Sequence, residues 1–395
     1  MRATRLPTPF MHTHDGTTHV HAPEPKVAAA TGPGAWHVHG TVLPGNEPRD
    51  LWIGDGRVHA DPIADATTIA RDAWILPGLV DAHCHIGLGP QGPVERDTSE
   101  RQALTDRDAG TLLIRDAGSP SDTRWIDDRP DLPEIIRAGR HIARPKRYIR
   151  HYADEVDPGE LVTAVERQAA RGDGWIKLVG DWIDREVDDL MPLWPDDVAA
   201  AAIARAHELG ARVTAHCFGE ESAAQLVRAG IDGIEHGTGL DAATIALMAE
   251  RGVSLVPTMV NLENFPAIAG RAEERFPRYA AHMRALHARR VETIGSAVDE
   301  GVPVYAGTDA GGSVPHGLIG REIELLAAVG GIDFALGAAS WRARSWLGRP
   351  GLGDGAPADL VIYTTDPRRD PAAVRHPALV VLKGRAVASP TPHGA

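Results

Sequence analysis

The feature that most constrains the fold is an alternation of short apolar segments with helical stretches between residues 76 and 350. Strands are expected in the segment that ends at His83 and at 111–115, 141–148, 174–179, 212–216, 233–236, 253–257 and 302–307. Helical patterns between them cover 159–171, 196–209 and 221–229. Such alternation is typical of βα units in a parallel sheet. Eight units fit a closed (β/α)8 TIM-like barrel better than an open sheet, so the chain is predicted to be an α/β protein with a barrel over 76–350.

Short strand patterns with turn sequences flank this region on both sides. Residues 34–75 contain such patterns around Gly-Asn and Asp-Gly turns, and residues 351–390 return to them. The two chain ends are therefore predicted to pair into one small, discontinuous β-sandwich beside the barrel. Residues 1–33 mix Pro, Thr, Ala and His with little periodicity, and they are predicted to form a disordered tail.

Charge and hydropathy limit the possible partners. The net charge of −13 argues against a nucleic acid or an anionic membrane as the main partner. No apolar run approaches the roughly 20 residues that a bilayer span needs. We therefore expect a cytoplasmic protein with a small-molecule substrate, and a homo-oligomer is possible. Cys84 and Cys217 are too few for a disulfide framework and are expected to pack against the helices.

Two histidines one residue apart end the apolar run 75–85. Because successive side chains of a strand point to opposite faces, His83 and His85 project the same way and can hold one ion. Three other His-x-His pairs occur, at residues 12 and 14, 19 and 21, and 37 and 39, and such a pair alone is more often ordinary polar sequence. His83 and His85 differ because a glycine-containing loop follows them, which places them at a strand's carboxyl end.

Four further strands carry residues of the same kind. His216, His236 and Asp309 each end an expected strand ahead of a glycine-containing loop, and Lys177 lies inside an apolar strand. Burying an unpaired ammonium is costly, and one escape is reaction of the neutral amine with carbon dioxide to give an anionic carbamate. The alternative is a lysine that reaches solvent from the strand end or pairs with Asp181.

Together these segments resemble the amidohydrolase superfamily of metal-dependent hydrolases, in its imidazolonepropionase-related and prolidase-like branch. The matching segments are 76–85, Ile176-Lys177, His216, Glu235-His236-Gly237, Gly307-Thr308-Asp309-Ala310 and Ala358-Asp359-Leu360-Val361. The resemblance implies that His83, His85 and Asp309 hold one divalent ion and that His216 and His236 hold another. It also implies that a carbamylated Lys177 bridges the two ions.

The implied chemistry is hydrolysis of a C–N bond in a linear or cyclic amide. Two cations about 3.5 to 4 Å apart stabilise a bridging hydroxide, and Asp309 is placed to act as general acid and base. Imidazole and carboxylate ligands suit zinc. One alternative is a one-metal deaminase or cyclic-imide hydrolase, similar to imidazolonepropionase, in which Lys177 is an ordinary lysine. Another is a barrel without catalytic activity that serves as a binding module.

Weaker signals concern the substrate. Tyr152 and His151 fall in the loop after the third expected strand, where they are placed to donate to a developing oxyanion. His316 lies past the Gly-Gly loop after Asp309 and is predicted to bind or orient the substrate. Arg115, Asp181, Trp182 and Asn261 also follow strand ends, but a structural or surface role is at least as well supported for each.

Overall fold

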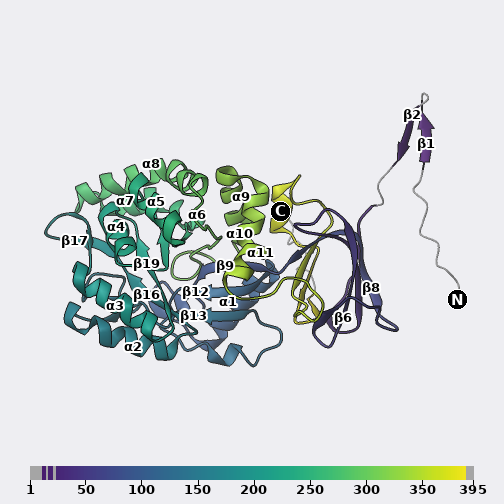
Figure 1. Cartoon of the computed structure of the whole chain (residues 1–395), viewed down its shortest axis with the longest axis horizontal. Helices are drawn as coiled ribbons and strands as arrows, with labels where there is room; N and C mark the ends of the chain where they lie inside the picture. Colours follow the sequence, from purple (N-terminus) through teal and green to yellow (C-terminus); the bar gives the residue numbers. More distant parts are fainter. Residues whose placement is uncertain (1–10, 15–16, 21–23, 388–395) are drawn as a thin grey trace.

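Parallel strands surrounded by helices form the larger part of the molecule (Figure 1). The computed structural model describes residues 11–14, 17–20 and 24–387. The barrel strands are β9 (Leu79–Cys84), β12 (Thr111–Asp116), β13 (Glu134–Arg137), β14 (Ile142–Ala143), β16 (Trp175–Val179), β19 (Arg212–Cys217), β20 (Gly233–His236) and β21 (Ser254–Val256). Neighbouring strands pair in parallel from β9 through β12 to β13, and from β14 through β16, β19 and β20 to β21.

The segment 302–310 closes the ring between its first and last strands. Val304 forms a parallel bridge with Leu255 of β21, and Ala310 forms one with Cys84 of β9. The backbone N–H of Ala82 also donates to the carbonyl of Ala306 at 2.8 Å. Because all these strands run the same way, their carboxyl ends meet at one edge of the barrel. The predicted barrel fold is confirmed.

The third position of the barrel differs from the sequence prediction. A single strand was expected over 141–148, but only Ile142–Ala143 is extended there, and β13 precedes it as an unpredicted strand. Gly139, at φ +71°, interrupts the two short strands. Pro145 has no N–H for a ladder, and Lys146 adopts φ +62°, so the chain leaves the sheet after Ala143.

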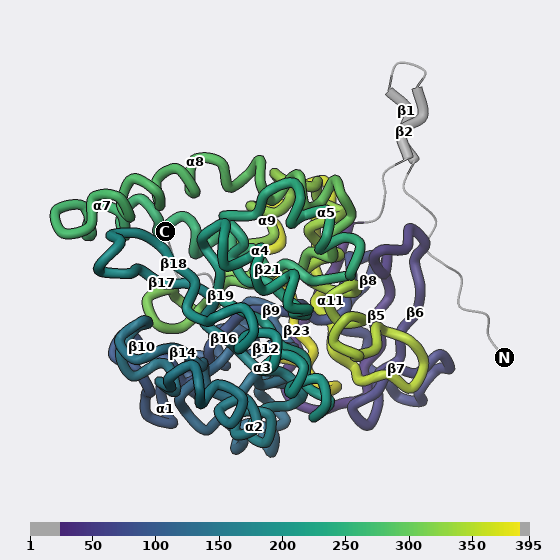
Figure 2. Tube along the Cα trace, turned by 60° about the vertical axis from the view of Figure 1, so that its left-hand side comes forward, coloured from purple at the N-terminus to yellow at the C-terminus, as the bar shows by residue number. Residues whose placement is uncertain are grey.

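Helices cover the outside of the barrel (Figure 2). They are α1 (Arg96–Asp108), α2 (Leu161–Arg171), α3 (Asp196–Glu208), α4 (Glu220–Arg228), α5 (Ala242–Arg251), α6 (Met259–Leu262), α7 (Phe265–Ala272), α8 (Pro277–Asp299), α9 (Ile319–Gly330), α10 (Ile332–Ala339) and α11 (Trp341–Trp346). The bounds of α2, α3 and α4 agree with the predicted helices within two residues. In α3 the buried residues Ala199, Ala202, Ile203 and Ala206 recur at helical spacing, which gives one apolar face for the barrel.

A second sheet joins the two ends of the chain beside the barrel (Figure 1). Within the described residues its strands are β3 (Lys26–Val27), β4 (Gly32–Pro33), β5 (Trp36–Val42), β6 (Pro48–Gly54), β7 (Arg57–His59), β8 (Thr67–Pro77), β22 (Leu360–Tyr363), β23 (Leu379–Leu382) and β24 (Arg385–Val387). The long strand β8 pairs antiparallel with β22 and runs through Gly78 into β9. It therefore connects this sheet to the first barrel strand, while the exact domain boundaries stay a prediction.

Part of the segment predicted to be a disordered tail has strand structure. β3 pairs with β8, β4 pairs with β24, and β1 (Met11–His14) pairs with β2 (Thr17–Val20). Strands of two to four residues that pair mainly through the backbone leave little periodicity in a sequence. Residues 1–10, 15–16 and 21–23 of that segment lie outside the described residues.

Candidate metal centre

The carboxyl ends of the barrel strands bring together three predicted ligands from the first and last strands. His83 lies near the end of β9, His85 directly follows β9, and Asp309 lies in the closing segment 302–310. The Nε2 atoms of His83 and His85 are 3.1 Å apart, and the Oδ1 atom of Asp309 lies 3.1 Å from the first and 2.9 Å from the second. These three atoms therefore form a compact triangle of donors.

The other two predicted histidine ligands form a second close pair. His216 of β19 presents its Nδ1 atom 3.0 Å from the Nε2 atom of His236 of β20. Donor atoms of His83, His236 and Asp309 also all lie within 4.8 Å of one another, so the pair adjoins the triangle. All four histidine side chains are almost fully buried.

The spacing of these atoms fits divalent ions. Protein nitrogen and oxygen ligands lie about 2.0 to 2.2 Å from zinc, so two ligands of one ion are separated by roughly 3 Å. In both groups the observed distances between donor atoms, 2.9 to 3.1 Å, agree with this expected separation. The residues present therefore suit one ion at the triangle and another at the His216–His236 pair.

Three histidines have their outer nitrogen fixed by a neighbour. The Nδ1 atom of His83 lies 2.7 Å from Glu235, that of His85 lies 2.7 Å from the carbonyl of Gly118, and that of His236 lies 2.7 Å from the Thr258 hydroxyl. A neutral imidazole that donates from Nδ1 keeps its lone pair on Nε2. The tautomers set by Glu235 and Gly118 thus direct the lone pairs of His83 and His85 toward the proposed ion.

His216 is turned the other way and faces a buried carboxylate. Its Nε2 atom has no hydrogen-bond partner among the described residues and lies 3.9 Å from Oδ1 of Asp181, which also lacks one. The other oxygen of Asp181 accepts hydrogen bonds from Phe218 N and Gly219 N, both at 2.9 Å, and from the hydroxyl of Ser222. Asp181 is therefore fixed behind His216 and stabilises the ring with Nδ1 toward the site.

Lys177 lies inside the barrel wall among these groups. It occupies the centre of β16, opposite Thr214 of β19, and its side chain is 1% exposed. Burial lowers the pKa of its ammonium from 10.5 to about 8, although the charges of Glu235 and Asp309 oppose that shift. A substantial fraction of neutral amine is therefore present near pH 8, as carbamate formation requires.

Asp309 is ionised in this environment. Burial alone would raise the pKa of its carboxyl, but the adjacent imidazoles of His83 and His85 hold the pKa well below its usual range. Burial and the charge of Lys177 together lower the pKa of His216 to about 3. At neutral pH the cluster therefore offers a carboxylate and a neutral imidazole, which are the protonation states that a metal ion needs.

Glu235 contacts the cluster through His83, and its role was not evident from the sequence. Its carboxylate is 0% exposed and joins His83 to Arg115, whose Nη2 atom lies 2.5 Å away, and to the hydroxyl of Thr214. A charged residue inside an apolar strand beside His236 was the available signal. Without the fold, nothing indicated which cation would pair with it.

A cavity of about 250 Å³ opens above the cluster. Its lining includes His85, His141, Tyr148, Trp182, Asn261 and Asp309. His141, a residue that the sequence analysis did not single out, is 1% exposed, and burial lowers its pKa well below the usual range. Its Nδ1 atom has no hydrogen-bond partner among the described residues. A neutral imidazole is therefore available at the cavity wall next to His85, with the two ring centres 5.1 Å apart.

The three predicted substrate-binding residues have different positions. Tyr152 lines the cavity, and its hydroxyl donates to the carbonyl of Gly89 at 3.0 Å. His151 is exposed and lies outside the cavity lining. His316 lies behind β9, where its Nδ1 atom is 2.8 Å from Asp106 and 3.8 Å from Cys84. The structure brings only Tyr152 close to the proposed ligands, because Asp106 of α1 holds His316 on the opposite face of β9.

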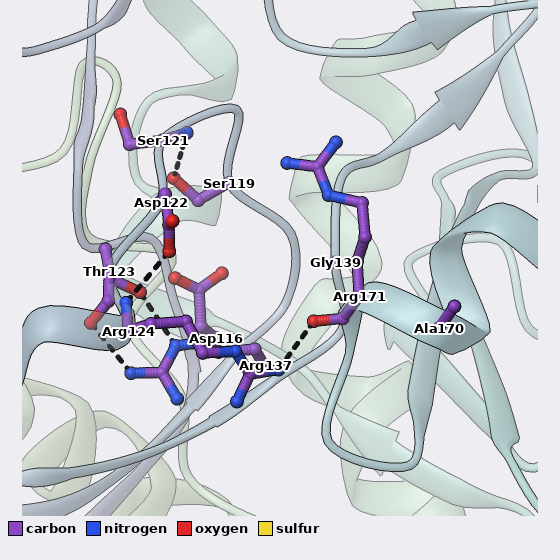
Figure 3. A pocket seen from close by; sticks show the side chains of 10 residues that line it. All are labelled: Asp116, Ser119, Ser121, Asp122, Thr123, Arg124, Arg137, Gly139, Ala170 and Arg171. Carbon is purple, nitrogen blue, oxygen red and sulfur yellow. Dashed lines mark hydrogen bonds between the residues drawn. The ribbon is translucent and has the colours of Figure 1, made fainter. Parts of the chain in front are cut away.

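A different hollow, of about 280 Å³, lies beside the end of β12 (Figure 3). Its lining includes Asp116, Ser119, Thr123 and Arg137 but none of the proposed metal ligands. The guanidinium of Arg137 is already hydrogen-bonded to Thr123 and to two carboxylates, those of Asp127 and Asp173. The buried histidine and aspartate cluster, and not this hollow, is therefore the candidate functional site.

Buried histidines and an aspartate at the carboxyl edge of a helix-covered parallel barrel lie where barrel enzymes have their active sites, and they are residue types that bind zinc in proteins. The model of the amidohydrolase family matches residues 191–387. The chain belongs to the amidohydrolase family. An uncharacterized protein of Mycobacterium tuberculosis is 59% identical over 351 residues, which cover 88% of this chain and 95% of that protein. Ochratoxinase of Aspergillus niger is 26% identical over 243 residues, which cover 59% of this chain and 49% of the ochratoxinase.

Solved structures share the same fold. A Xaa-Pro dipeptidase with bound methionine superposes with a TM-score of 0.76 at 21% identity, over 90% of this chain and 100% of that one. The A. niger ochratoxinase superposes with a TM-score of 0.73 at 19% identity, over 90% of this chain and 96% of that one. Among the described residues, none of the helices has the length and apolarity of a membrane span.

The position of Asp181 behind His216 leads to a prediction about metal affinity. Asp181→Asn removes the charge that faces the outer nitrogen of His216, so we expect zinc affinity to fall by about tenfold to a hundredfold. Competition with a chelator of known zinc affinity measures this change. Asp241→Asn, at the exposed N-cap of α5, where the carboxylate accepts a hydrogen bond from Thr244 N, is the control and should change zinc affinity little. Equal zinc affinity in the Asp181 variant and the parent protein would contradict this role.

Proposed function

We propose that the protein is a metal-dependent hydrolase that cleaves a C–N bond in a linear or cyclic amide. The observation that carries the proposal is the meeting of two donor groups at the barrel's carboxyl edge, one made of His83, His85 and Asp309 and the other of His216 and His236. Membership of the amidohydrolase family supports hydrolysis of such bonds. The similar solved structures include a dipeptidase, which by its name cleaves an amide bond.

Two divalent ions, of which zinc suits the ligands best, would be held by these two groups. A carbamate on Lys177 would join the two sites, since Lys177 is buried in β16, next to the strand of His216, and its charge interacts with that of Asp309. When bound, such ions polarise a carbonyl and make a water molecule acidic enough to react near neutral pH. The low polarity around Lys177 favours the neutral amine from which the carbamate forms.

The protein's own groups would then move the proton and hold the substrate. Asp309 is the general acid and base, because its Oδ1 faces the histidines while its Oδ2 accepts a hydrogen bond from Asn261 at 2.7 Å. Neutral His141 donates to the substrate carbonyl from the cavity wall. Tyr148, whose ring centre lies 5.4 Å from that of His141, and Trp182, which meets the Tyr148 ring edge to face with centres 4.8 Å apart, exclude water beside His141.

One observation favours a second candidate, a one-metal deaminase or cyclic-imide hydrolase. His83, His236 and Asp309 alone place three donor atoms within 4.8 Å of one another, which is enough for one ion with an open position. In that case Lys177 is an unmodified lysine whose charge is balanced by Glu235. A small-molecule substrate and a cytoplasmic location remain predictions in both cases.

The role of Asp309 predicts the effect of Asp309→Asn. The amide side chain keeps one oxygen for a metal ion but cannot accept the proton, so we expect kcat for amide hydrolysis to fall by about 10² to 10⁴. Assays on N-acyl amino acid and lactam libraries, with zinc content measured in parallel, provide the test. Asp299→Asn, at the exposed end of α8, is the matched control. A variant with full kcat and full zinc content would contradict the assignment.

The depressed pKa of Lys177 predicts how metal uptake depends on pH. Below pH 8 the ammonium dominates and above it the amine does, so the amine fraction rises roughly twentyfold between pH 6.5 and 8.5. At fixed dissolved carbon dioxide, we expect uptake of the second ion by metal-free protein to rise across this range. Metal analysis and carbon-13 NMR with labelled bicarbonate follow the two events.

Lys177→Ala provides the control for this experiment. The variant has no amine to react, so its metal content should not depend on bicarbonate at any pH. If the parent protein also binds the same amount of metal with and without bicarbonate, and gives no carbamate signal, Lys177 is an ordinary lysine and the one-metal candidate is favoured.

A further inference from the structure

A second, strongly basic groove lies beside the cavity over the candidate metal centre. It has a volume of about 620 Å³, and its lining includes Arg140, Lys146, Arg150, His151 and Arg185. The one acidic residue in this lining is Glu155, which accepts a hydrogen bond from the backbone N–H of Lys146. Four permanent cations therefore face a concave surface that contains a single carboxylate.

The cations of this groove lack partners of opposite charge. Among the described residues, Arg140, Lys146, Arg150 and Arg185 form no ion pair, and only Arg140 has side-chain hydrogen bonds, to the carbonyls of His151 and Tyr152. By contrast, Arg147 in the same loop pairs with Asp184 at 2.6 Å. An excess of unpaired positive charge is unexpected in a chain with a net charge of −13, so the groove offers a site for an anion.

The groove adjoins the cavity over the metal centre. Tyr148 lines both hollows, while the nearby residue Ile149 lines the cavity and His151 lines the groove. The two hollows therefore meet at Tyr148, and a substrate long enough to pass this ring would place its far end among the cations. The groove is too far to one side to hold the bond that the candidate ligands would attack, since none of those ligands lines it.

The loop that carries the groove is held in one conformation. The Tyr152 hydroxyl donates to Gly89, and the Arg140 guanidinium donates to the carbonyls of His151 and Tyr152, all at 3.0 Å. Lys146 and His151 have backbone φ values of +62° and +69°. Residues other than glycine rarely adopt such positive values, and they do so where the surrounding structure imposes them. Arg140, Lys146 and Arg150 are thus carried by a fixed backbone, which reduces the ordering cost of binding, while Arg185 reaches the groove from the turn between β17 (Asp181–Asp184) and β18 (Asp189–Pro192).

We propose that this groove binds an anionic group, a carboxylate or a phosphate, at the end of the substrate distant from the bond that is cleaved. Guanidinium groups hold such oxyanions with paired hydrogen bonds, and Arg150 and Arg185 are the two exposed arginines free to do so. The proposal rests on the proposed amide hydrolysis for the identity of the ligand as a substrate. It assigns Arg150 and Arg185 as residues that determine specificity.

The test compares the parent protein with the double variant Arg150→Gln/Arg185→Gln. The variant Arg228→Gln, at the exposed end of α4, is the control for loss of a surface positive charge outside the groove. The probes are two N-acyl derivatives of phenylalaninamide. One carries a succinyl group that ends in a free carboxylate, and in the other that carboxylate is replaced by a neutral amide. In the double variant we expect KM for the carboxylate probe to rise by about tenfold and kcat for this probe to stay unchanged. Both KM and kcat for the neutral probe should also stay unchanged. The difference in KM between the parent protein and the double variant should be smaller at high salt, because salt screens the attraction between exposed charges.

Calorimetric titration with glutarate and with neutral glutaramide separates the two proposals, because it needs no turnover. Glutarate should bind the metal-loaded parent protein and the Arg228 variant equally, and the double variant about tenfold more weakly, while glutaramide should not distinguish them. If the amides are not hydrolysed but glutarate shows this pattern, the proposed function fails and the groove remains an anion site. Equal glutarate affinity in all three proteins would overturn the proposal.

Discussion

The buried carboxylate of Glu235 is the interaction on which the candidate site depends. It is fully enclosed, yet it contacts Arg115 at 2.5 Å and the Nδ1 atom of His83 at 2.7 Å. A buried charge is tolerated only when it is paired and hydrogen-bonded, and each of these groups supplies what the others need. Glu235 also offsets the charge of Lys177, which lies two strands away on the other side of β19. The barrel can thus carry cationic and anionic groups in its centre while the His83 lone pair points at the proposed ion.

Backbone strain at the edge of the barrel accompanies this arrangement. His236, Thr258 and Asp309 all adopt positive φ values, of +66°, +50° and +61°. Such conformations cost of order 1 to 3 kcal/mol each for residues other than glycine, and they persist where packing imposes them. The Thr258 hydroxyl contacts His236, and two backbone N–H groups after Thr258 donate to the buried carboxylate of Glu322. The surrounding helices therefore hold the strand ends in the positions that the ligands require.

The sequence was sufficient for the fold class because its signals are local. Short apolar strands, helices between them and ligand-type residues at strand ends can each be recognised within a few residues, and parallel strands place such ends together. Asp181 behind His216, Glu235 between His83 and Arg115, and the position of His316 could not be deduced, because each is a contact between side chains far apart in the chain. The extent of the third strand was wrong because Gly139 and Pro145 interrupt a segment that otherwise resembles one strand.

The most direct test of the two-ion site is a crystal structure of protein prepared with zinc and bicarbonate, with anomalous diffraction measured on both sides of the zinc absorption edge. We expect two zinc peaks, one within bonding distance of His83, His85 and Asp309 and the other within bonding distance of His216 and His236, with density for a carbamate on Lys177 between them. A single peak with an unmodified lysine, or zinc bound away from these histidines, would contradict this expectation.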